Sequence, residues 1–287
     1  TEAGTQYNVL HGYTMELDST LFYGNITPVN KDRKLAITIN TYGEDVESVG
    51  YKIRSLEDKS LIENTEVSGY QVTDNKINVT LNIKNLLDTG KEYALEVVLK
   101  TKKHDEVYYY TRIMYGTDYD LQKKLDFVKD FNACTFDSAR LKDIGGYLET
   151  SSVGDNTNYG KVNINCSLSQ VGWGDLEPYI ESEITPEIIS INDDVAIIRL
   201  DYRVGAANDY SSSDTYNVNE YYRIRQANSG FYLLNFEREM NQVFDAKNDL
   251  TSSAKINLGI NSSTDVNCTS DEKGIYTYFV NQGSLWC

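Results

Sequence analysis

Five carboxylates lie between residues 175 and 187 with no basic residue among them: Asp175, Glu177, Glu181, Glu183 and Glu187. Two carboxylates at a suitable separation can hydrolyse a glycosidic bond, one as general acid and the other as base or nucleophile. Several together can bind Ca²⁺ through oxygen ligands. An acidic run is more commonly a solvated surface, however, so we expect neither a metal site nor a cofactor.

Aromatic rings offer a second kind of chemistry, because sugars and peptides can stack on an exposed ring. Trp173 lies between Gly172 and Gly174, and these glycines could leave its indole accessible. Tyr109 is the middle of three consecutive tyrosines, which a strand would turn to both faces, so at least one ring should be exposed. We therefore predict Trp173 and Tyr109 as ligand-binding residues, with burial of Trp173 between sheets as the alternative.

Catalysis by a nucleophile requires Ser or Cys beside a base. The only imidazoles are His11 and His104, and His104 falls in a polar turn. The sequence has no Gly-x-Ser-x-Gly elbow and no glycine-rich loop of the kinds that bind phosphates or dinucleotides. We assign no catalytic residue and expect a non-enzymatic protein, with a carboxylate-dependent glycoside hydrolase as a less favoured alternative.

The four cysteines are Cys134, Cys166, Cys268 and Cys287. Their spacing fits no zinc motif, and four are too few for a disulfide scaffold in a chain of 287 residues. Cys268 and Cys287 could face each other across neighbouring strands, but spacing alone does not establish a disulfide. We expect free, mostly buried thiols.

Composition and charge exclude several classes of protein. The net charge is −16, of which residues 1–116 carry −4 and the remainder −12. Such acidity repels a phosphate backbone, so no nucleic-acid partner is expected. No apolar stretch approaches the roughly 20 residues of a membrane helix. Residues 1–5 are polar and lack Met, so we expect that a signal or anchor segment has been removed and that the protein is extracellular.

The element pattern begins with a β-sandwich over residues 8–116. Alternating strands at 77–83 and 93–99 flank a turn that contains Leu87, Gly90 and Tyr93. A Leu, a turn Gly and a Tyr that opens the next strand form the pattern of a tyrosine corner. With about seven short strands, this segment resembles a fibronectin type III or immunoglobulin-like sandwich, and that resemblance implies a spacing or binding role.

The rest of the chain has a different pattern of predicted elements. Apolar residues at helical spacing from 121 to 131 predict a helix capped by Asp118 or Asp120, and 139–148 predicts a second, shorter one. A polar loop ends this helical segment, residues 117–160. Residues 161–287 alternate as antiparallel strands, with similar hairpins at Gly230 and Gly283. They predict an α+β meander, or the opening blades of a β-propeller truncated at its C-terminus.

The overall composition and domain pattern resemble those of surface-anchored multidomain proteins of Gram-positive bacteria, which are acidic, rich in Tyr and Asn, and poor in Pro. This resemblance implies a cell-surface or envelope protein that acts as a spacer, docking or interaction module. Its expected partner is a protein or a glycan at the cell surface. The alternative is a carbohydrate- or peptide-binding protein that uses exposed aromatic side chains.

Overall fold

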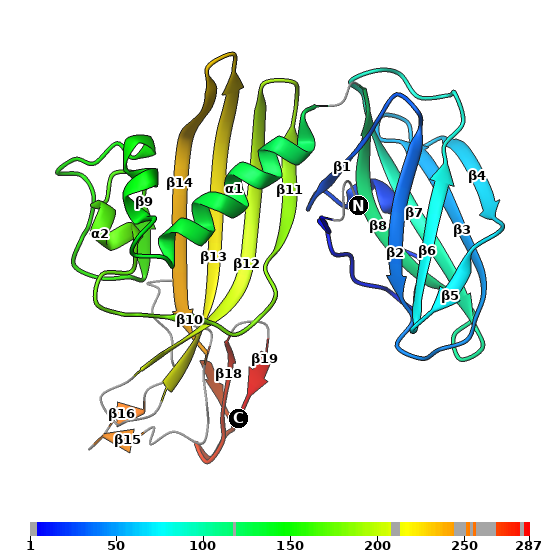
Figure 1. The fold of residues 1–287 in the computed structure, drawn as a ribbon. Helices are drawn as coiled ribbons and strands as arrows, with labels where there is room; N and C mark the ends of the chain where they lie inside the picture. The colour runs from blue at the N-terminus through cyan, green and yellow to red at the C-terminus, as the bar shows by residue number, and fades with distance from the viewer. Residues whose placement is uncertain are drawn as a thin grey trace. The chain divides into compact units, whose positions relative to one another are not determined.

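The computed structural model describes residues 5–116, 119–207, 213–243, 251–252, 255–256, 268–281 and 284–287. The fold is mainly β with a few helices, as predicted (Figure 1). Two compact units interleave along the sequence: residues 1–130, 185–199 and 222–234 form the first, and residues 131–184, 200–221 and 235–287 form the second. Among the described residues, no helix has both the length and the apolar character required to cross a membrane.

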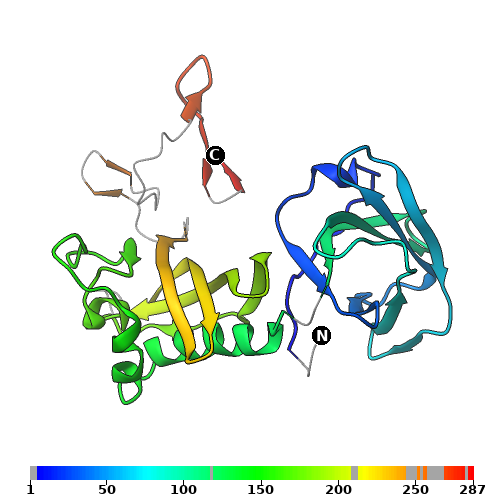
Figure 2. The ribbon, with the colours of Figure 1, turned by 90° about the horizontal axis from the view of Figure 1, so that it is seen from above.

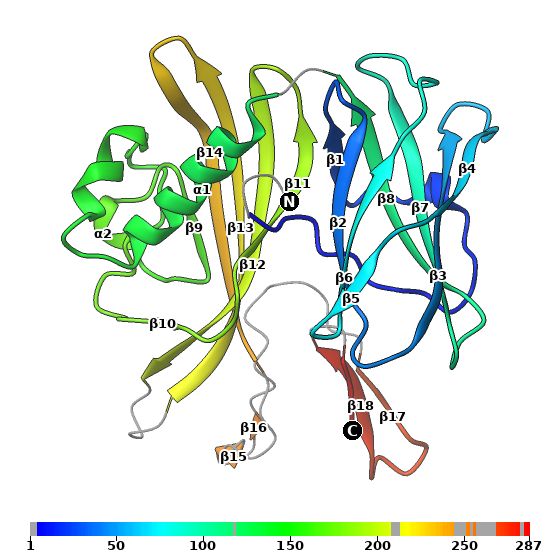
Figure 3. The same ribbon diagram turned by 45° about the vertical axis from the view of Figure 1, so that its right-hand side comes forward.

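The first unit contains the predicted sandwich, whose two sheets lie in separate layers (Figures 1 and 3). One sheet has the strand order β1 (Ile26–Val29), β8 (Val107–Tyr115), β7 (Glu92–Thr101), β3 (Val46–Ser55) and β4 (Leu61–Val67). The other has the order β2 (Lys34–Asn40), β6 (Lys76–Asn82) and β5 (Gln71–Thr73). All neighbours pair antiparallel except β1, which pairs parallel with β8.

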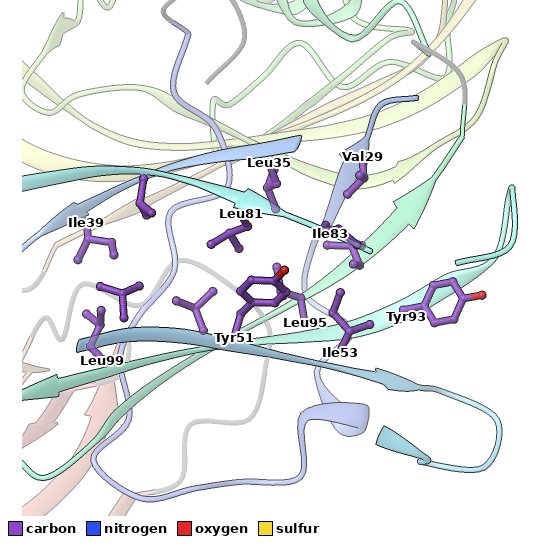
Figure 4. Close-up of a cluster of buried hydrophobic side chains, with 14 of the residues drawn as sticks. Val29, Leu35, Ile39, Tyr51, Ile53, Leu81, Ile83, Tyr93, Leu95 and Leu99 are labelled. Atoms are coloured by element: carbon purple, nitrogen blue, oxygen red, sulfur yellow. The ribbon is translucent and has the colours of Figure 1, made fainter. Parts of the chain in front are cut away.

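Alternation along the strands makes the core between these sheets. In β6, Ile77, Val79 and Leu81 are buried while the residues between them are exposed. They pack with side chains from the facing sheet, including Tyr51 and Leu95 (Figure 4). Removal of this apolar surface from water is the main force that holds the two sheets together.

The turn before β7 has the geometry of a tyrosine corner. The Tyr93 side chain is 2% exposed, and its hydroxyl accepts a hydrogen bond from the backbone nitrogen of Asp88 at 2.9 Å. Leu87 is buried in the same core, and Gly90 has a φ of +74°, which glycine adopts without strain. This contact is the one that the Leu, Gly and Tyr spacing predicts.

The later strands form one six-stranded sheet. Its main path is β10 (Tyr179–Ile180), β12 (Val195–Ala207), β13 (Ser213–Ala227), β14 (Gly230–Gln242) and β9 (Lys161–Asn163), and β11 (Thr185–Ile191) also pairs with β12. Two folds are predicted here, an α+β meander and the opening blades of a β-propeller. The consecutive strands β12, β13 and β14 are neighbours in one sheet, as in the meander. The Gly230 hairpin joins two long strands of this sheet, and Gly283 lies outside the described residues.

Helix α1 (Leu121–Thr135) lies across one face of this sheet (Figures 1 and 2). Phe127 stacks on Phe231 with ring centroids 5.0 Å apart, and Phe131 contacts Phe236 at 5.4 Å. The predicted cap Asp118 is outside the described residues, while the Asp120 carboxylate accepts hydrogen bonds from the Lys123 and Gln226 side chains. The predicted second helix is the 3₁₀ helix η2 (Leu141–Tyr147).

The remaining elements are short. They are the 3₁₀ helix η1 (Ser19–Leu21), the helix α2 (Leu168–Val171), the pair β15 (Thr251–Ser252) and β16 (Lys255–Ile256), and a three-stranded sheet of β17 (Cys268–Ser270), β18 (Thr277–Asn281) and β19 (Ser284–Trp286).

Candidate functional site

The long strands β12 and β13 give the sheet two different faces. Tyr202 and Glu220 both contact Asn132 of α1, so their side chains point to the face that this helix covers. Both are buried. Asp201 and Arg203 belong to the opposite, open face, since successive residues of a strand point to opposite sides. Asn217 and Asn219 reach the open face from β13 in the same way.

The covered face carries a buried polar cluster. Nε of Arg238 donates to Oε1 of Glu220 at 2.7 Å, and Nη1 donates to the Val171 carbonyl at 2.8 Å. Asn132 donates to Oε2 of Glu220 at 2.8 Å. Burial raises the pKa of Tyr202 well above its usual value, and the adjacent Glu220 carboxylate raises it further. These ionisable groups are buried, and they link strands β13 and β14 to helix α1.

Trp173 belongs to this cluster, which corrects its prediction as a ligand-binding residue. The side chain is 1% exposed, and the guanidinium carbon of Arg238 lies 3.7 Å from its ring centroid. The flanking glycines have the opposite effect from the predicted one. A Cβ on Gly172 would come 2.3 Å from Leu141, and one on Gly174 would come 2.2 Å from the Tyr159 hydroxyl. Both glycines therefore allow neighbouring side chains to approach the backbone on either side of Trp173.

Tyr109 is also no exposed platform. Its ring is half-buried against the sandwich core, and burial raises the pKa of its hydroxyl. The neighbouring Tyr108 and Tyr110 are 7% and 5% exposed, so the expectation of an exposed ring among these tyrosines is wrong. The reason is the N-terminal segment: Phe22 stacks on Tyr110 with ring centroids 4.4 Å apart, and Tyr13 pairs with Tyr108 through backbone hydrogen bonds.

The open face of the sheet holds a polar groove of about 430 Å³ in the second unit. Its lining residues are Ser182, Asp201, Tyr202, Arg203, Asn217, Val218, Asn219 and Asn241. Tyr202 and Val218 have buried side chains, so the exposed lining side chains are those of polar residues. A volume of this size falls within the range of small-molecule sites. We regard this groove as the candidate functional site.

Hydrogen bonds hold the groove side chains in place. Arg203 donates from Nε to Oδ1 of Asn217 at 3.2 Å, and its backbone nitrogen donates to Oγ of Ser182 at 2.8 Å. The Asn219 amide donates to the Asp201 carboxylate. Asp201, Arg203, Asn217 and Asn219 are all on the paired strands β12 and β13 and are bonded to neighbours, so the groove presents a pre-arranged set of donors and acceptors.

An exposed aromatic ring lies beside the groove. Tyr179 is 50% exposed and pairs across β10 and β12 with Gly205, which shares the open face with Arg203. A Cβ on Gly205 would come 2.3 Å from Cζ of Tyr179, so the ring lies directly over this glycine. The Tyr179 hydroxyl also contacts Oγ of Ser213 at 3.1 Å. Alternation in β12 could have identified the open face, but the pairing that brings Tyr179 to it has no signal in the sequence.

The acidic run does not gather into one site. Asp175, Glu177 and Glu183 are exposed. Glu181 accepts a hydrogen bond from Thr215, and Glu187 pairs with Arg199. Over the part of the chain that the structure describes, no group of three or more His, Cys, Asp or Glu side chains is arranged to hold a metal ion.

The cysteines are all free, and two of them are exposed. Cys134 and Cys166 are buried, whereas Cys268 and Cys287 are exposed, so the expectation of mostly buried thiols holds for only half of them. Cys268 is in β17, and Cys287 follows β19. Both strands pair with β18, which lies between them, so the two cysteines do not face each other across neighbouring strands.

The chemistry available in the groove is hydrogen bonding. Of its exposed lining side chains only Asp201 is a carboxylate, and none is a His, Cys or Lys. No protein-family model matches this sequence, and no curated protein matches it either.

Proposed function

We propose that this protein is a non-enzymatic interaction module of a bacterial cell surface or envelope, and that it binds its partner in the groove on the open face of the β12–β13–β14 sheet. The observation that carries the proposal is the groove itself, a hollow of about 430 Å³ whose exposed lining side chains belong to polar residues, one of them a carboxylate. The sandwich in the first unit fits the spacer or docking role that such modules have in surface proteins.

The surface location is supported by charge and composition. A net charge of −16 disfavours nucleic acids and anionic membranes as partners. The composition, rich in Tyr and Asn and poor in Pro, resembles that of anchored proteins of Gram-positive bacteria. A protein or glycan of the envelope is therefore the partner that we propose.

A sedimentation assay with Gram-positive cell envelopes tests this proposal. The fluorescently labelled chain is mixed with purified envelopes, and bound protein is measured against envelope concentration. We expect saturable binding that the double variant Asp201→Ala/Asn219→Ala weakens. Asp45→Ala is the matched control, because Asp45 is an exposed carboxylate of the sandwich with an ion pair to Lys102.

Two results would overturn the proposal. One is the absence of saturable binding to the envelopes. The other is catalysis: if the chain releases reducing ends from envelope polysaccharides, and Asp201→Asn abolishes that release, the protein is a hydrolase.

A further inference from the structure

We infer that the groove binds a neutral saccharide. One sugar ring packs on Tyr179, and hydroxyl groups along the saccharide bond to Asp201, Arg203 and Asn219. This inference rests on the proposed function and names the class of ligand for the same site. Every residue involved belongs to the second unit.

The first argument is the fixed ring of Tyr179. Half of the side chain is exposed, although its ring lies against Gly205 and its hydroxyl contacts Ser213. A ring that is already held loses little conformational freedom when a ligand packs on it. Tyrosine also offers an apolar face together with a polar tip, which matches a sugar with its C–H groups and hydroxyls.

The second argument is the mixture of donors and acceptors. The Arg203 guanidinium only donates, the Asp201 carboxylate only accepts, and the Asn219 amide does both. A sugar hydroxyl both donates and accepts, so neighbouring hydroxyls can satisfy this mixed set. A sulfate only accepts, so it could bond to Arg203 and Asn219 but would be repelled by the neighbouring Asp201 carboxylate, which it cannot satisfy.

Charge and shape exclude the nearest competitors. Glu181 lies beside the groove through its contact with Thr215, and the whole chain is strongly acidic, so an anionic glycan would be repelled. A peptide would need an apolar pocket for its anchoring side chains. Tyr202 and Val218 are the two apolar or aromatic lining residues, and both have buried side chains, so the groove exposes no apolar lining side chain to anchor a peptide.

Binding of defined oligosaccharides tests the inference. The probes are tetrasaccharides of β-linked glucose, α-linked mannose and N-acetylglucosamine, with heparin and polygalacturonate as anionic probes and a random hexapeptide pool as the peptide probe. Affinity is measured by isothermal titration calorimetry with the full chain. We expect at least one neutral tetrasaccharide to bind, and Tyr179→Ala to weaken it about tenfold.

Gly205→Ala supplies a second variant that leaves every lining residue of the groove unchanged. The new methyl group would come 2.3 Å from Cζ of Tyr179 and 2.6 Å from Oε1 of Glu181, so both side chains would move, and we expect a loss of affinity similar to that of Tyr179→Ala. If it acts only through the ring, the double variant should bind no more weakly than Tyr179→Ala alone. Tyr42→Ala, at a tyrosine that is 86% exposed in the sandwich, should change the affinity less than twofold. Thermal melting of each variant confirms that it is folded.

The outcomes separate this inference from the proposed function. Preferential binding of the anionic probes or the peptides would overturn the inference. So would an affinity for neutral tetrasaccharides that Tyr179→Ala and Gly205→Ala leave unchanged. Saturable binding to envelopes without binding to any oligosaccharide would overturn the saccharide inference and leave the proposed interaction module standing. If the chain binds neither envelopes nor oligosaccharides, the proposed function is overturned as well.

Discussion

Nε of Arg238 lies 2.7 Å from Oε1 of Glu220, and neither side chain has any exposed surface. The same guanidinium stacks on Trp173 and donates to the Val171 carbonyl. A fully buried ion pair has lost its hydration, so its two charges depend on each other and on the surrounding dipoles. In this protein the pair joins strands β13 and β14 under helix α1.

Replacement of one partner should therefore be costly. Glu220→Gln keeps the shape of the side chain but leaves the Arg238 charge buried without its counter-charge. We expect the free energy of unfolding to fall by about 3–5 kcal/mol, measured by urea denaturation. Asp45→Asn, in the exposed pair with Lys102, should cost about 0–1 kcal/mol. The double variant Glu220→Leu/Arg238→Met should recover part of the loss. A loss below 1 kcal/mol for Glu220→Gln would contradict the role assigned to this pair.

The tyrosine corner gives a smaller, cleaner prediction. Tyr93→Phe removes one hydroxyl that accepts from the Asp88 backbone and leaves the buried ring in place. We expect a loss of about 0.5–1.5 kcal/mol in the free energy of unfolding. Asp88→Ala should retain the contact, because the donor is a backbone nitrogen. Tyr42→Phe is the control at an exposed position. Equal stability of Tyr93→Phe and the original chain would show that the corner contributes nothing.

The contrast between Tyr93 and Tyr179 shows what the sequence could predict. The corner joins residues five apart, so spacing alone identifies it. Alternation likewise identified strands of the sandwich, and apolar residues at helical spacing identified the helix at 121–131. Tyr179 reaches the groove only through the pairing of β10 with β12, which links residues far apart in the chain. Local pattern carries no information about such a register, and the candidate site therefore could not be assembled from the sequence.

Trp173 shows a different limit. Glycines next to an aromatic residue predict exposure only when nothing approaches them. Here Leu141 and Tyr159 come close to Gly172 and Gly174, and both belong to segments that the sequence places in other elements. The same glycine signal is thus compatible with an open platform and with tight packing. Only the tertiary contacts distinguish the two.

Acid stability should report on Asp18. Hydrogen bonds from Lys59 and Thr20 lower the pKa of its carboxyl to about 2. A lowered folded-state pKa contributes stability above the unfolded-state value near 4, and this contribution is lost as the pH falls towards 2. We therefore expect Asp18→Asn to destabilise the protein at pH 6 and to have a smaller effect at pH 2.5. Urea midpoints measured across this pH range provide the test, and an effect independent of pH would contradict it.

Thiol reactivity should divide the four cysteines into two pairs. Cys268 and Cys287 are exposed, whereas Cys134 and Cys166 are buried. With Ellman's reagent under native conditions, we expect two thiols to react rapidly and the other two to react only in denaturant, because buried thiols are shielded from the reagent.

The double variant Cys268→Ser/Cys287→Ser should lose the rapid phase completely. Mild oxidation should not join Cys268 to Cys287 within one folded chain. Strand β18 separates β17 from β19, so residues at matched positions on the outer strands lie about 10 Å apart, beyond the usual Cα separation of a disulfide. Mass spectrometry of oxidised, digested protein checks this, and an intramolecular Cys268–Cys287 peptide from natively folded monomer would contradict the strand order of the small sheet.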